Sequence, residues 1–161
     1  MTRMILATWL LVLMVAAPVS AEPHWPDQGW QVTPTSLAYD DLLEALREAV
    51  EAEGMFVVTE AGPTEAAANR GITLPGNRVV GVFRNDYAVR ILRLSVPAMI
   101  EAPMRFYVTE NDDGSATLSW KTPTHLLEPY VDAAGEELET VGRELDTLFA
   151  AIAQRATEES K

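Results

Sequence analysis

His125 and Glu128 stand three residues apart between Pro123 and Tyr130, a spacing that could support acid–base or metal chemistry. On a helical turn the two side chains would share one face, as either chemistry requires. Two ligands make a poor zinc site, and the chain has no cysteine and only one other histidine. We therefore interpret this segment as a surface turn, and we keep His125 and Glu128 as candidate binding residues.

Arg84 and Asn85 directly follow an apolar segment, residues 78–83, that is typical of a buried strand. Residues in this position often line a cleft, and an arginine there could clamp a carboxylate or a phosphate. An alternative is that Asn85 and Asp86 cap the helix predicted after them. The sequence leaves both interpretations open.

Trp120 lies on the same strand face as Leu118, which favours a core position over a stacking platform for a ligand. We retain it as a candidate, because a pocket beside Arg84, Trp120 and His125 would favour a binding function. The predicted binding residues are Arg84, Asn85, Trp120, His125, Glu128 and Tyr130. No catalytic residue, metal ligand or cofactor is predicted.

Two other motifs resemble metal sites but lack necessary ligands. If the chain is cut after Ala21, His24 becomes the third residue, as in amino-terminal copper sites, but Pro23 has no amide hydrogen to lose. The acidic segment at residues 111–113 lacks the alternating acids and the closing glutamate of a calcium loop. We interpret it as a hairpin turn.

The first 21 residues have the layout of a secretory signal peptide. Arg3 precedes an apolar run at residues 5–17, and the small residues Ser20 and Ala21 suit cleavage after Ala21. The run is shorter than the roughly 20 residues that span a bilayer. We expect a periplasmic or secreted protein without a stable membrane anchor after cleavage; an uncleaved anchor is the alternative.

Composition excludes several classes of function. The formal net charge is −12 and becomes more negative without residues 1–21, so the chain should repel nucleic-acid backbones. Without cysteine it has no disulfide and no thiol chemistry. It also lacks a nucleophile elbow, a phosphate loop, a dinucleotide fingerprint and a zinc-protease motif.

Hydrophobic periodicity predicts an α+β fold. Strands are expected at residues 30–36, 55–59, 78–83, 104–110 and 116–120, and helical segments at 37–53, 63–70, 86–94 and 136–155. This order favours an antiparallel sheet of about five strands with helices packed on one face. We predict a short leader at 22–29, a single domain at 30–157 and a disordered tail at 158–161.

Four segments in series resemble domain-of-unknown-function family 302, a bacterial family. They read AVEAEGMFVV (49–58), AAANRGITLP (66–75) with VVGVF (79–83), APMRFYVTE (102–110) with Asp113–Gly114, and SWKTP (119–123) with Tyr130. The resemblance implies a strand, a helix, four strands and a helix, similar to the TATA-binding-protein fold, and a homodimer. It implies no established activity.

The chain departs from the family pattern at two places. Many members have Gly-Asn-Pro where this chain has Arg84-Asn85-Asp86, and many carry a histidine near Pro63 or Thr64.

Three functional hypotheses follow. The first, which we prefer, is a non-catalytic module that binds a small ligand or a periplasmic protein. The second is an enzyme of unrecognised type that uses His125 and Glu128. The third is a purely structural homodimer.

Overall fold

The computed structural model describes residues 23–158 of the 161-residue chain. Its elements are β1 (Trp30–Ala38), α1 (Tyr39–Ala52), β2 (Phe56–Ala61), α2 (Thr64–Ala68), β3 (Asn77–Phe83), α3 (Asn85–Leu94), the 3-10 helix η1 (Pro97–Glu101), β4 (Met104–Glu110), β5 (Ser115–Lys121), α4 (Pro123–Ala134) and α5 (Glu136–Thr157). The predicted signal peptide, and all but the first residue of the predicted tail, lie outside the described residues. Within the described part no helix is long and apolar enough to cross a membrane.

The five strands form one antiparallel sheet in the order β1-β5-β4-β3-β2. The predicted fold class is confirmed: the protein is α+β, with a five-stranded antiparallel sheet. β1 lies at an edge, where Pro34 is tolerated because its missing N–H removes no bond inside the sheet.

The connection from β4 to β5 is the predicted hairpin turn. Asn111 donates its backbone N–H to the Ser115 carbonyl over 2.8 Å. Asp113 Oδ1 accepts a hydrogen bond from the Ser115 backbone N–H over 3.0 Å. The polar side chains of this segment therefore hold a turn, as the sequence predicts.

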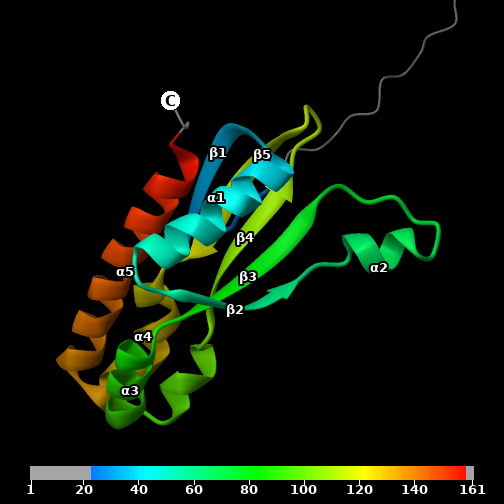
Figure 1. Cartoon of the computed structure of the whole chain (residues 1–161). Coiled ribbons are helices and arrows are strands. Elements are labelled where there is room, and N and C mark those ends of the chain that lie inside the picture. Colours follow the sequence, from blue (N-terminus) through cyan, green and yellow to red (C-terminus); the bar gives the residue numbers. More distant parts are fainter. Residues whose placement is uncertain (1–22, 159–161) are drawn as a thin grey trace, which may run out of the picture.

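One face of the sheet packs against the helices. Alternate side chains of β4 and β5 are buried on this face: Met104, Phe106, Val108, Ala116, Leu118 and Trp120. Phe106 is fully buried and stacks on Phe149 of α5 with their ring centroids 4.6 Å apart. Burial of one such ring stabilises the fold by about 1.5–3 kcal/mol. Figure 1 shows α1 and α5 side by side over this face, with α2 projecting from the β2–β3 connection.

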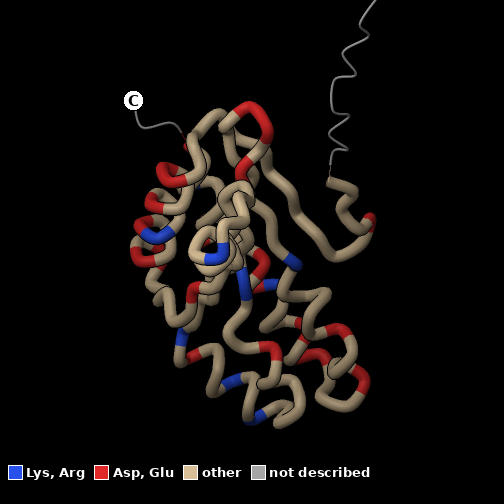
Figure 2. The backbone as a smooth tube through the Cα atoms, turned by 90° about the vertical axis from the view of Figure 1, so that its right-hand side faces the viewer, with Lys and Arg blue, Asp and Glu red and all other residues tan. Residues whose placement is uncertain are grey.

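No helix of the described residues packs on the opposite face of the sheet, which we call the open face. The segment that precedes β1 covers part of it. Trp25 of this leader lies 5.3 Å from Trp30 and 6.2 Å from Tyr107, measured between ring centroids. Figure 2 shows the acidic residues mainly along the helices and at the β4–β5 turn, with one more in the leader.

Helix α4 corrects the prediction of a surface turn at residues 123–130. Pro123 occupies the first turn, where no amide hydrogen is needed, and Pro129 lies within the helix. Thr124 donates its backbone N–H to Asp146 Oδ1 over 3.0 Å and its hydroxyl to Oδ2 over 2.7 Å. The carboxylate that accepts hydrogen bonds from the first turn of α4 therefore belongs to Asp146 of α5, 22 residues further along the chain.

Candidate functional site

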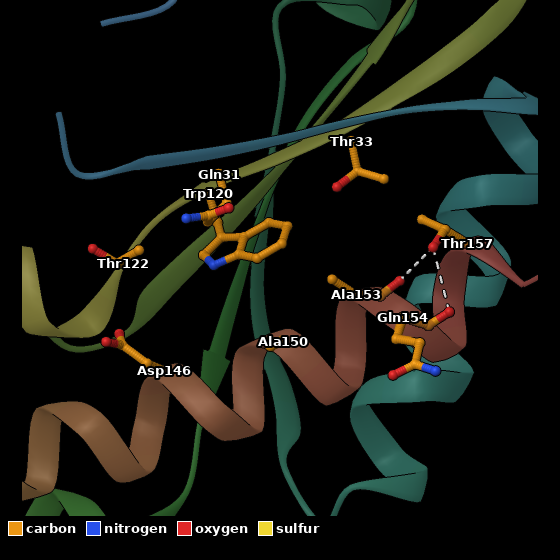
Figure 3. Close-up of a pocket in the computed structure, with 9 residues that line it drawn as sticks. All are labelled: Gln31, Thr33, Trp120, Thr122, Asp146, Ala150, Ala153, Gln154 and Thr157. Carbon is orange, nitrogen blue, oxygen red and sulfur yellow. Dashed lines mark hydrogen bonds between the residues drawn. The ribbon is translucent and has the colours of Figure 1, made fainter. Parts of the chain in front are cut away.

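A groove of about 490 Å³ lies between β1, the end of β5 and helix α5 (Figure 3). Small-molecule sites occupy roughly 300–1,000 Å³, so the groove has the size of a binding site. Its lining residues are Gln31, Thr33, Trp120, Thr122, Asp146, Ala150, Ala153, Gln154 and Thr157.

Small and polar side chains explain why this space is unfilled. The register of β1 on β5 directs Gln31 and Thr33 toward the helices, where apolar residues would close the core. On α5, Phe149 packs on the centre of the sheet, whereas Ala150 and Ala153 are too short to reach β1. Helix α5 therefore covers the centre of the sheet but leaves the groove open along the edge strand β1.

Trp120 is both a core residue and a wall of the groove. Its side chain packs on Phe106 with ring centroids 5.6 Å apart, and the whole residue is 6% exposed. In Figure 3 the indole nitrogen points toward α5. The two interpretations of Trp120 in the sequence are thus compatible, because one edge of a buried ring faces the groove.

Asp146 provides a carboxylate at one end of the groove. Each of its oxygens accepts one hydrogen bond from Thr124, which fixes the orientation of the group. A carboxylate with one bond per oxygen can still accept from a ligand. The groove therefore combines an indole N–H, a fixed carboxylate and two side-chain amides, from Gln31 and Gln154. No lysine or arginine of residues 23–158 lines it.

Arg84 and Asn85 lie away from the groove, at the end of β3. Arg84 donates to both carboxylate oxygens of Asp86, over 2.8 and 3.1 Å, and its guanidinium lies 4.4 Å from the centre of the Tyr87 ring. This hydrogen bond holds the pKa of Asp86 below its usual value. Helix α3 begins without a side-chain capping hydrogen bond. The crevice beside Arg84 has about 30 Å³, room for about one water.

His125 and Glu128 share the first turns of α4, with His125 Nδ1 3.5 Å from Glu128 Oε2. The imidazole packs on Gly29, where an added Cβ would lie 2.2 Å from the ring. Thr122 also donates its backbone N–H to the Gly29 carbonyl over 2.8 Å. His125 therefore joins the leader to α4, and it lines no part of the groove.

The described residues contain no group of three or more His, Asp or Glu side chains that could hold a metal ion.

Tyr130 lies further along α4 and donates its hydroxyl to Glu101 Oε1 over 2.7 Å. This hydrogen bond raises the pKa of Tyr130.

The six predicted residues do not form one site. The structure brings His125 and Glu128 together, and of the six only Trp120 lines the groove. Sequence reasoning missed Gln31, Asp146 and Gln154. One sequence feature could have indicated the groove. Gln31 is a polar residue at a position of the edge strand β1 that points toward the helices, and it faces the small residues Ala150 and Ala153 of α5.

Comparisons with known proteins agree with this fold. The model of the family described as "Domain of unknown function DUF302" matches residues 31–152. A solved structure described as an uncharacterized conserved protein DUF302 from Bacillus stearothermophilus is similar, with a TM-score of 0.71 and 19% sequence identity. The similarity covers 80% of this chain and 98% of that one. A comparison with curated proteins gave no match.

Proposed function

Since this chain belongs to the family described as domain of unknown function DUF302, whose description states no activity, we propose its function from its geometry: a non-catalytic module that binds a small molecule. The observation that supports the proposal is the groove of about 490 Å³ along β1 and α5. Its apolar wall and few convergent polar groups are what small-molecule sites usually offer.

The lining selects the charge of the ligand. Among the described residues that line the groove, Asp146 alone is ionisable, and the chain as a whole has a net charge of −12. A carboxylate or phosphate on the ligand would meet repulsion without a compensating cation. The ligand is therefore a neutral or cationic molecule that hydrogen-bonds to the Asp146 carboxylate and to the Trp120 N–H.

A fluorine-labelled tryptophan experiment tests the groove. Protein with 5-fluorotryptophan is titrated with a set of neutral and amine-bearing fragments and with matched carboxylates. We expect members of the first set, and not the carboxylates, to shift the Trp120 resonance, which Trp120→Phe identifies.

The substitution Ala150→Leu fills the groove from an exposed position and should abolish the shift. Thr147→Leu places the same side chain on an exposed position of α5 outside the groove and should preserve it. A Trp120 resonance that no fragment moves, or that still moves in Ala150→Leu, would refute the proposal.

The export of the protein is also a proposal. It is supported by the charged, apolar and small-residue order of residues 1–21, and the intact mass of the purified protein tests it. The residue that follows the cut would be Glu22, the first residue of the predicted leader.

A homodimer is a second proposal, supported by apolar side chains at the surface of α3 and η1. Leu92, Val96 and Ile100 are 47%, 72% and 78% exposed. Large apolar side chains this exposed, and this near one another in the sequence, favour an interface with another chain. The mass of the native assembly tests this proposal.

A further inference from the structure

The open face of the sheet differs in charge from the rest of this acidic protein. No strand position that points to this face is an aspartate or a glutamate. The register aligns one row of residues across all five strands on this face: Trp30, Lys121, Arg105, Gly81 and Thr59. Two cations thus lie in the middle of a row that contains no acid.

Arg105 and Lys121 are cross-strand neighbours. Phe106 of β4 pairs with Trp120 of β5. Arg105 and Lys121 lie one position beyond this pair, at the same end of the antiparallel ladder, so their side chains point to the same face. Opposed residues of antiparallel strands have Cβ atoms about 4.5–5.5 Å apart, and like charges in these positions destabilise a sheet. The fold keeps two positive charges side by side.

Neither cation is neutralised by the described residues. Several arginines of the helices and Arg78 of β3 form ion pairs, such as Arg47 with Glu60 and Arg90 with Glu144, but Arg105 and Lys121 form none among the described residues. Lys121 lies 5.7 Å from the centre of the Trp30 ring, a cation–π contact that orients it without cancelling its charge.

Gly81 brings a third donor into the row. An added Cβ there would lie 2.2 Å from Thr59 Oγ1, so the absent side chain lets the Thr59 hydroxyl approach the strand next to Arg105. No hydrogen bond of that hydroxyl to another described residue is present. Three donors therefore line up with no acceptor among the described residues.

We propose that this row binds an oxyanion, the carboxylate or phosphate group of a small molecule, between Arg105 and Lys121. A bridging oxyanion removes the repulsion between the two cations and accepts the charge-assisted hydrogen bonds that a guanidinium offers. The net charge of −12 opposes polyanions at long range, so the site suits a single anionic group. This site faces away from the groove and does not depend on it.

Amide chemical shifts test the proposal. The protein is titrated with sodium phosphate and with sodium acetate, each against sodium chloride at equal ionic strength. We expect saturable shifts centred on residues 105 and 121 with phosphate, with acetate or with both. The anion that causes them shows whether the site takes phosphate groups, carboxylates or either. Arg105→Gln and Lys121→Gln should each weaken binding by about tenfold.

Arg93→Gln is the matched control, because Arg93 is an exposed cation of α3 without an ion pair among the described residues. It should leave the affinity unchanged. In chloride alone, Lys121→Gln should raise the melting temperature or leave it the same, since it removes a like-charge neighbour. Shifts no larger than with chloride, or an equal loss in Arg93→Gln, would overturn the proposal.

Discussion

Gly29 and Gly114 have the same left-handed backbone conformation, with φ of 72° and 83°, but different surroundings. A Cβ on Gly29 would lie 2.2 Å from the His125 ring, whereas a Cβ on Gly114 would meet nothing within 4 Å. We predict that Gly114→Ala lowers the free energy of unfolding by about 1 kcal/mol through strain alone. Gly29→Ala should lower it by a further 1–3 kcal/mol or so through overlap. Urea unfolding measures both.

A double substitution separates the two contributions. With His125 already replaced by alanine, Gly29→Ala should cost only as much as Gly114→Ala, because the ring that it would overlap is gone. If the two glycines prove equally sensitive in the native background, the contact between His125 and the leader does not exist in solution.

Individual residues were the least predictable part of the candidate site. Trp120 was among the predicted binding residues, but the groove it lines also depends on Gln31 and Asp146, which lie far from it in the sequence. The opposition of Arg105 and Lys121 is likewise a property of strand register, and no local pattern reveals it.

At the scale of elements, a salt bridge joins α1 to β2. Arg47 Nε and Nη2 donate to the two carboxylate oxygens of Glu60 over 2.7 and 2.8 Å. The hydrogen bond from Arg47 lowers the pKa of Glu60. Because both side chains are partly exposed, we predict that Glu60→Gln lowers the free energy of unfolding at pH 7 by about 0.5–1 kcal/mol.

The pH dependence of that difference has a definite sign. A carboxyl with a lowered folded pKa stabilises the fold above its unfolded pKa, about 4.3 for glutamate, and this contribution disappears as pH falls through the folded pKa. Urea unfolding at several pH values should therefore show the wild-type advantage over Glu60→Gln vanishing in acid. Glu48→Gln, an exposed position of α1 that forms no ion pair with another described residue, should show no such difference at any pH.

Elements with strong periodicity were predictable from the sequence. Alternation over 104–110 and helical spacing over 136–155 gave β4 and α5 within a few residues. Helix α4 was not predictable from local signals, since Pro123 and Pro129 favour a turn and the stabilising carboxylate, Asp146, belongs to α5. Tertiary hydrogen bonds decided the structure there.

At the scale of the whole molecule, native mass spectrometry tests export and assembly together. For protein isolated from an exporting cell, we predict subunits that begin at Glu22 and a dimer that dissociates on dilution. Ala21→Phe places a large residue at the cleavage site and should retain residues 1–21. Full-length wild-type subunits would refute cleavage, and a monomer at all concentrations would refute the dimer.

The position of β1 in the sheet sets the order in which the fold can be completed. Among the described residues β1 is the first strand, and the strand it pairs with there is β5: Trp30 pairs with Lys121, and Thr35 Oγ1 donates to the Ala116 carbonyl 81 residues later. Such distant pairing is slow to form. A chain that emerges from its amino terminus cannot close its sheet until residue 121 has followed. If the chain is exported as we propose, it would pass the translocation channel before the sheet can close, and β1 would be among the last strands to pair.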